Sequence, residues 1–136
     1  MTLLELAASL PNGLHDAEIT ELSLSFRERV IRITVDVWIG DMAAPRERLE
    51  EYRPALIELS DFEYCILDRP DATYPYKTNR ELTIDVTAAD PSVALAGEGS
   101  ACRFWVGDWN SFIHIRAGEA VLTWTGPAVF RPPAAS

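Results

Sequence analysis

Residues 31–37, IRITVDV, alternate strictly between apolar and polar side chains inside the longer run VIRITVDVWI. Successive side chains of a strand point to opposite faces of a sheet, so this alternation predicts a strand that is buried on one face. The stretch TELSLSF at 20–26 alternates in the same way, and only RER at 27–29 separates the two runs. Two such runs joined by three residues predict an antiparallel hairpin. Its apolar face is predicted to carry Leu22, Leu24, Phe26, Ile31, Ile33, Val35, Val37 and Ile39.

The rest of the chain repeats this period of two in shorter runs. We expect strands at 54–60, 62–67, 80–88, 101–107, 111–117 and 120–125, and a tight turn at Gly118-Glu119. In the run at 80–88, Leu82, Ile84 and Val86 form the face that is predicted to be buried. About eight short strands without alternating long helices predict a mainly β protein with a single domain over 1–136. Its architecture is expected to be an antiparallel sandwich or an open barrel.

Helical signals are few. Residues 1–10 are predicted to hold a short helix, with Thr2 as its N-cap, Glu5 three residues later, and Pro11 after its end. One further helical turn is expected to start at Pro45, and residues 126–136 read as a tail.

The net charge of −9 lies almost entirely in the first half of the chain. Residues 1–68 hold fourteen acidic and six basic side chains, which give −8, whereas residues 69–136 give −1. An acidic half repels phosphate backbones, so nucleic-acid binding is not expected, and a basic protein partner suits it better. Solubility alone is the alternative explanation. The start of the chain does not resemble a signal peptide and no apolar run has the length of a membrane span, which predicts a cytoplasmic protein without a membrane partner.

No catalytic or cofactor motif stands out. The chain contains no G-x-S-x-G, no G-x-G-x-x-G after a strand and no P-loop, so we expect no cofactor and a non-enzymatic role. Cys65 and Cys102 lie in the apolar runs FEYCIL and ACRFWV, and their spacing matches neither a zinc motif nor C-x-x-C. Two buried reduced thiols are expected, with a single disulfide as the alternative.

His15-Asp16 follows the turn signal Pro-Asn-Gly in LPNGLHDAEI. Adjacent residues of a strand face opposite ways, so the two side chains meet only if the chain bends there. The favoured interpretation is a structural turn, in which His15 or Asp16 caps free backbone amides where the strand enters the sheet. The alternative is a metal site that the fold assembles from His15, His114 and either Asp36 or Asp16.

Several polar and aromatic side chains fall on strand faces or in loops where they could contact a partner. Trp38 lies on the polar phase of its strand, and Trp105 is out of phase with its apolar neighbours, which is consistent with an interface or a second packed sheet. Core filling is the favoured interpretation, because the interiors of sandwiches and barrels use such residues. His114 shares a strand face with Phe112 and Arg116 and is expected to be a satisfied, half-buried side chain. The candidate contact residues for a protein partner are Trp38, Glu47, Glu50, Glu51, Tyr74 and Tyr76.

The stretch LPNGLHDAEITELSLSF and the following VIRITVDVWIG resemble a group of small bacterial β-rich proteins. In these proteins a His-Asp-Ala or His-Asp-Ser signature leads into a β-hairpin, and here His15, Asp16 and Ala17 match it. Some members of the group are assigned as immunity proteins of polymorphic toxin systems. The resemblance implies a cytosolic binding protein, and it carries no catalytic residues.

Two functional hypotheses follow. The first is an immunity-type protein that neutralises a basic partner by occlusion, with the acidic half as the contact surface. The second is a small-molecule site in an open barrel, with Asp36, Trp105, His114 and Arg116 in an aromatic-lined pocket. A homodimer with Trp38 at its seam is a further alternative.

Overall fold

The computed structural model describes residues 1–73, 81–90 and 100–131. It confirms the mainly β class, because nine strands form one open antiparallel sheet. The sheet order is β10-β4-β3-β2-β6-β7-β8-β5, and β9 also pairs with β4. Within the described residues, no helix has the length and apolar character that a membrane crossing requires. The elements are α1 Leu3–Ser9, β1 Pro11–Leu14, β2 Glu18–Ser25, β3 Val30–Trp38, α2 Arg46–Leu49, β4 Glu51–Leu59, β5 Tyr64–Leu67, β6 Leu82–Ala89, β7 Ser100–Val106, β8 Ser111–Ala117, β9 Ala120–Trp124 and β10 Val129–Phe130.

The predicted hairpin is confirmed as β2 and β3, whose residues pair from Glu18↔Asp36 to Ser25↔Val30. The apolar phase of β3 is almost completely buried, as the alternation predicts. Phe26, which is also predicted to lie on the buried face of the hairpin, is instead 73% exposed, because β2 ends at Ser25 and Phe26 lies in the turn. Leu24, at the same end of the hairpin, is 37% exposed, although Ile31, its partner across the hairpin, is fully buried.

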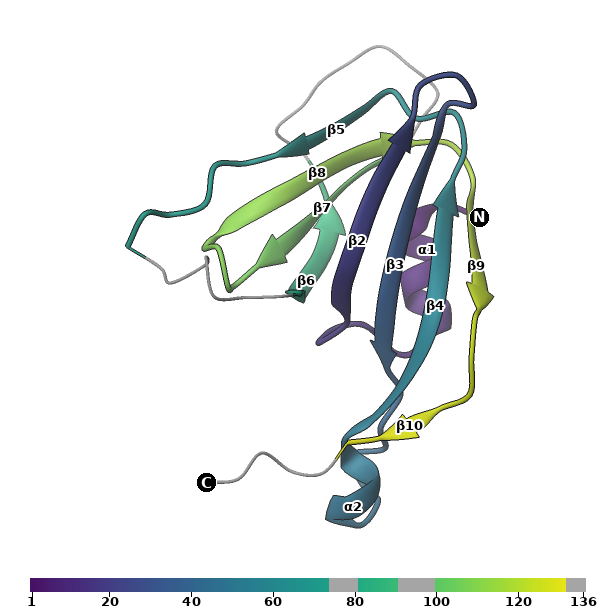
Figure 1. Ribbon diagram of the computed structural model, residues 1–136, viewed down its shortest axis with the longest axis vertical. Coiled ribbons are helices and arrows are strands. Elements are labelled where there is room, and N and C mark those ends of the chain that lie inside the picture. The colour runs from purple at the N-terminus through teal and green to yellow at the C-terminus, as the bar shows by residue number, and fades with distance from the viewer. Residues whose placement is uncertain (74–80, 91–99, 132–136) are drawn as a thin grey trace.

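The sheet folds over at the junction between β2 and β6. Only two pairs join these strands, Glu18↔Thr83 and Ile19↔Leu82. One half then comprises β2, β3, β4, β9 and β10, and the other half comprises β5 to β8. Figure 1 shows β2, β3 and β4 side by side, with β5, β7 and β8 crossing at an angle and α1 lying behind β3 and β4. The inner faces of both halves and the apolar side of α1 form a single core.

The helical predictions are confirmed in outline. The hydroxyl of Thr2 accepts a hydrogen bond from the backbone N–H of Glu5 (3.1 Å), and α1 ends at Ser9, two residues before Pro11. Pro45 precedes the single turn of α2. The buried residues Leu3, Leu6 and Ala7 face the sheet, so α1 closes one end of the core.

The tight turn expected at Gly118-Glu119 is confirmed, but the strands that it joins do not form a hairpin. β8 pairs with β7 and β5, whereas β9 pairs with β4, so this turn carries the chain from one half of the sheet to the other. It runs beside the β4–β5 connection, where the Gly118 N–H donates to the carbonyl of Ser60 (2.8 Å) and the Ser60 N–H donates to the carbonyl of Glu119 (2.9 Å). Because the two connections satisfy each other's backbone groups, a turn with a hairpin-like sequence makes a crossover instead.

The predicted burial of Val86 is also wrong. β6 carries a register shift between Ile84 and Val86, so Ile84 remains buried opposite Val106 while Val86 turns to the outer face opposite Trp105. A bulge inserts one residue into a strand and reverses the phase that follows it. Val86 is accordingly 54% exposed.

Two short strands lie where no strand is predicted. β1 spans the whole Pro-Asn-Gly segment and Leu14, and β10 lies within residues 126–136, expected to be a tail. β10 pairs with the start of β4, through Val129↔Tyr52 and Phe130↔Glu51. It thereby places Arg131 beside the sheet, where it becomes part of the surface described below.

Gly40→Ala is expected to lower the free energy of unfolding by about 1–3 kcal/mol through overpacking. A Cβ at Gly40 would overlap the carbonyl oxygen of Leu49 and crowd Nε1 of Trp38, and these two atoms form a hydrogen bond of 2.6 Å. Gly107→Ala is the matched control, because its Cβ would meet only the carboxylate of Asp85, the end of a side chain that can rotate. Urea unfolding of both variants tests the difference, and equal losses would contradict this explanation.

Candidate functional site

His15 and Asp16 lie where the chain enters the sheet. Asp16 adopts a left-handed conformation (φ 61°), and its backbone N–H donates to the carbonyl of Ile84 (2.8 Å). The bend brings His15 Nε2 within 3.5 Å of the Asp16 carboxylate. His15 Nδ1 lies 2.8 Å from the carbonyl oxygen of Asp85, and its ring meets Trp38 edge-on, with centroids 6.2 Å apart. The pair therefore links the first strands to β6.

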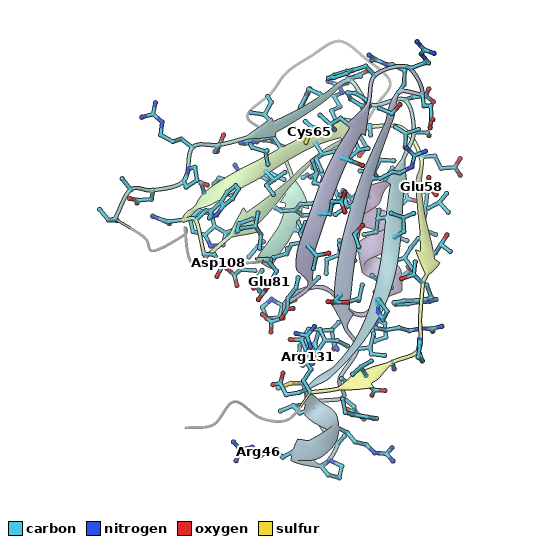
Figure 2. The ribbon with its side chains drawn as sticks, viewed as in Figure 1. Arg46, Glu58, Cys65, Glu81, Asp108 and Arg131 are labelled. Atoms are coloured by element: carbon cyan, nitrogen blue, oxygen red, sulfur yellow. The ribbon has the colours of Figure 1, made fainter. Side chains whose placement is uncertain are left out.

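The outer face of β2, β3 and β4 is acidic. Register places Glu18 beside Asp36, Glu21 beside Thr34, and Arg32 beside Glu58 on this side of the sheet. Figure 2 shows Glu58 towards the β9 side of the sheet and Arg131 near the opposite end of the strands, beside α2. We call this surface the acidic face. Its charged side chains are Glu18, Glu21, Glu28, Arg32, Asp36, Glu58 and Arg131.

Each arginine of the acidic face is held between two carboxylates. Arg32 contacts Glu28 (2.6 Å) and Glu58 (3.1 Å), and these contacts raise its pKa. Arg131 binds Glu18 through one nitrogen to both carboxylate oxygens (2.6 and 2.8 Å) and reaches Asp36 at 3.3 Å. Five carboxylates thus face two guanidinium groups, and the surface keeps a net negative charge.

Arg131 also covers Tyr52, with its guanidinium carbon 4.0 Å from the ring centroid. Burial, followed by the charges of Glu18 and Glu50, raises the pKa of Tyr52 to about 12, so the phenol stays neutral at physiological pH. The backbone N–H of Arg131 donates to the carbonyl of Glu50 (2.8 Å). Arg131, the last described residue, is therefore held against β2, β3 and β4.

Of the residues proposed from the sequence as protein contacts, the structure describes the side chains of Trp38, Glu50 and Glu51, which lie where β3 ends and β4 begins. Trp38 is half-buried and donates its indole N–H to the carbonyl of Leu49, so it packs against the β3–β4 connection. Glu50 and Glu51 are half-buried at the start of β4. The side chain of Glu47 and all of Tyr74 and Tyr76 lie outside the described residues.

The outer face of the second half is aromatic. Trp105 lies between Val86 and Phe112 in cross-strand register, and Arg103 lies between Ala88 and His114. The rings of Trp105 and Phe112 meet edge-on, with centroids 4.9 Å apart. We call the space between these side chains the aromatic hollow. It has a volume of about 230 Å³ and is lined by Val86, Ala88, Arg103, Trp105 and Phe112.

His114, next to the aromatic hollow, is held between two carboxylates. Its Nδ1 lies 2.5 Å from Asp90 Oδ2, and its Nε2 lies 3.0 Å from Asp68 Oδ2. The Asp90 side chain is completely buried, whereas that of Asp68 is 39% exposed. Because both ring nitrogens face acceptors, the imidazolium form satisfies the geometry. Burial acts to lower the pKa of His114, but the hydrogen bonds and charges of Asp90 and Asp68 outweigh it, and the pKa is raised.

The structure brings together only part of the predicted small-molecule pocket. Trp105, His114 and Arg116 share the outer face of β7 and β8, and Arg116 is buried against Glu63 at 2.7 Å. Asp36 lies on β3 in the other half and belongs to the acidic face. The aromatic hollow lies on the outer face of the sheet, whereas α1 and apolar side chains fill the inner side.

Sequence reasoning missed Asp68 and Asp90, the two partners of His114. Each acid directly follows a strand-like run, in FEYCILD and TIDVTAAD. An acid at the end of a strand is a usable signal, but it does not show which histidine it meets. That pairing depends on β8 lying between β5 and β7.

The described residues show no activated thiol and no metal site. Cys65 and Cys102 are free cysteines. Burial and the charge of Asp90 raise the pKa of Cys102 to about 12, and burial raises the pKa of Cys65, so both thiols are poor nucleophiles at neutral pH. Within the described residues, no three His, Cys, Asp or Glu side chains are grouped so that they could hold a metal ion.

Comparison with known proteins adds little to this geometry. The chain matches no protein-family model and no curated protein. It is similar to the crystal structure of an uncharacterised protein from Neisseria gonorrhoeae, with 14% identity, a TM-score of 0.42, and coverage of 79% of this chain and 90% of that chain. The proposals below therefore rest on the residues of this chain.

Proposed function

We propose that this chain is a non-enzymatic, immunity-type protein that binds and occludes a basic partner protein through the acidic face. The observation that carries the proposal is the acidic face itself, where five carboxylates share one side of β2 to β4 with two arginines. Unpaired negative charge on a preformed surface attracts a basic surface and raises the rate of association.

Rigidity of the acidic face supports this role. Cross-strand pairing sets the spacing of Glu18, Asp36 and Glu58, and the two arginines hold four of the five carboxylates in place. A surface that is already ordered loses little side-chain entropy when a partner binds. Trp38 and Tyr52 pair across β3 and β4 at the edge of the same face, where they supply apolar contact area.

Glu21→Lys tests the proposal at the one carboxylate of the acidic face that neither Arg32 nor Arg131 contacts. Glu21 is exposed on β2, opposite Thr34, and no arginine within the described residues contacts it. The tagged protein is used to isolate partners from its native lysate, and the affinity of a captured basic protein is then measured at low and moderate salt. We expect the substitution to weaken binding about tenfold at low salt, and added salt to reduce the difference by screening.

Glu119→Lys is the matched control, because it makes the same charge change at an exposed turn between β8 and β9. It is expected to bind the partner like the wild type. If both variants bind equally well, or if the wild type retains no basic protein at either salt concentration, the proposed function is wrong.

A further inference from the structure

Arg103 is unusual among the arginines that the structure describes. It is half-buried, yet within the described residues no carboxylate or carbonyl oxygen accepts a hydrogen bond from its guanidinium group. The other arginines that are buried or half-buried, Arg32, Arg53, Arg116 and Arg131, each donate to a carboxylate or a carbonyl. A half-buried cation without an acceptor is a natural counter-charge for an anionic ligand.

The aromatic hollow holds the Arg103 guanidinium in a defined place. Its carbon lies 4.5 Å from the centroid of Phe112, which orients the planar group over the ring. The two nearby carboxylates, Asp68 and Asp90, are already taken by the His114 imidazole between them. Arg116, on the far side of His114, is paired with Glu63. Arg103 therefore keeps donors that its neighbours do not use.

The remaining walls of the hollow suit a flat apolar group. Trp105 and Phe112 form two sides, and the bulge in β6 turns Val86 outwards to form a third. The volume of about 230 Å³ lies below that of sites for drug-sized molecules, which begin near roughly 300 Å³, so the hollow suits a ligand with one ring.

We propose that the aromatic hollow binds a small aromatic carboxylate. The carboxylate accepts paired hydrogen bonds from the Arg103 guanidinium, and the ring packs against Trp105 and Val86. The site lies on β6 to β8, whereas the acidic face lies on β2 to β4, so this inference is independent of the proposed function.

Benzoate is the probe that tests the site, with binding followed by the NMR shifts of the backbone amides and tryptophan indoles. We expect the largest shifts at Trp105 and at its neighbours on β6 to β8. Benzyl alcohol keeps the ring without the charge, and acetate keeps the charge without the ring. Both probes are expected to bind at least about tenfold more weakly than benzoate. Benzyl alcohol loses the charged hydrogen bonds to Arg103, and acetate loses the packing of the ring.

Arg103→Gln should weaken benzoate binding by at least about tenfold, and Arg103→Lys should restore only part of it, since lysine keeps the charge without the planar fork. Thermal unfolding of both variants confirms that they fold. The proposal is overturned if Arg103→Gln binds benzoate like the wild type, if acetate binds as well as benzoate, or if the shifts lie away from the hollow.

Two further arms separate related explanations. The peptide Gly-Gly-Phe presents an aromatic ring and a carboxylate as the C-terminus of a protein would. If it binds more tightly than benzoate, the ligand is a peptide terminus and the proposal of a small-molecule ligand is wrong. Glu21→Lys is expected to bind benzoate like the wild type, so a failure of the acidic-face proposal leaves this result intact.

Discussion

His114→Ala is expected to lower the free energy of unfolding by about 3–5 kcal/mol, the range for removal of one member of a buried ion pair. The Asp90 carboxylate is completely buried and lies 2.5 Å from His114 Nδ1, so the substitution removes a buried ion-pair contact of that carboxylate. Asp68→Asn is the matched control, because Asp68 is 39% exposed and water can replace its contact. Urea unfolding is expected to show a loss several times smaller for Asp68→Asn.

The same contact predicts a pH dependence. The pKa of His114 is raised in the folded protein, so its contribution to stability is complete below the unfolded value of about 6.5. The contribution is lost as the pH rises through the folded pKa. The stability difference between wild type and His114→Ala should therefore shrink as the pH is raised from 6 to alkaline values. A difference that stays constant or grows over this range would show that His114 is not held as an imidazolium.

Phe104→Ala is expected to lower the free energy of unfolding by about 3–5 kcal/mol, the usual range for a phenylalanine removed from a core. Phe104 is 1% exposed on the inner face of β7, and the cavity left behind would lie between the two halves of the sheet. Phe112→Ala, on the outer face of β8, is the control. It is expected to cost about 1 kcal/mol, because it opens no enclosed cavity.

The two phenylalanine variants also separate folding from binding. Phe112→Ala should keep the protein folded while removing a wall of the aromatic hollow and the ring beneath Arg103. Calorimetric or urea unfolding measures the stability of the variant, and benzoate titration measures its ligand binding. Equal destabilisation by both substitutions would mean that the outer face of β8 is part of a packed core.

One open sheet gives this protein two outward faces of different chemistry. The half with β2 to β4 presents carboxylates that hold arginines. The half with β6 to β8 presents aromatic rings around Arg103, which has no hydrogen-bond acceptor among the described residues. Neither face belongs to the core, because α1 and the two inner faces already bury one another.

Alternation along the chain was enough to predict the class, the β2–β3 hairpin, the N-cap at Thr2 and the shared face of Phe112, His114 and Arg116. These features depend on local backbone geometry, in which side chains of a strand alternate and a hydroxyl reaches an amide three residues away. The burial predicted from this alternation was wrong at two positions. At Val86 a bulge reversed the phase of the strand, and Phe26 lies beyond the end of β2.

Only the tertiary structure decided which strands are neighbours. β9 leaves β8 and pairs with β4, Arg131 crosses to Glu18 and Asp36, and Asp68 and Asp90 meet at His114. Each contact joins residues far apart in sequence, and such pairings are set by the packing of two sheet halves around α1. The period of two determines the face on which a side chain lies, because this alternation follows from the backbone of a single strand. The partner across that face depends on strand order, which no single strand encodes.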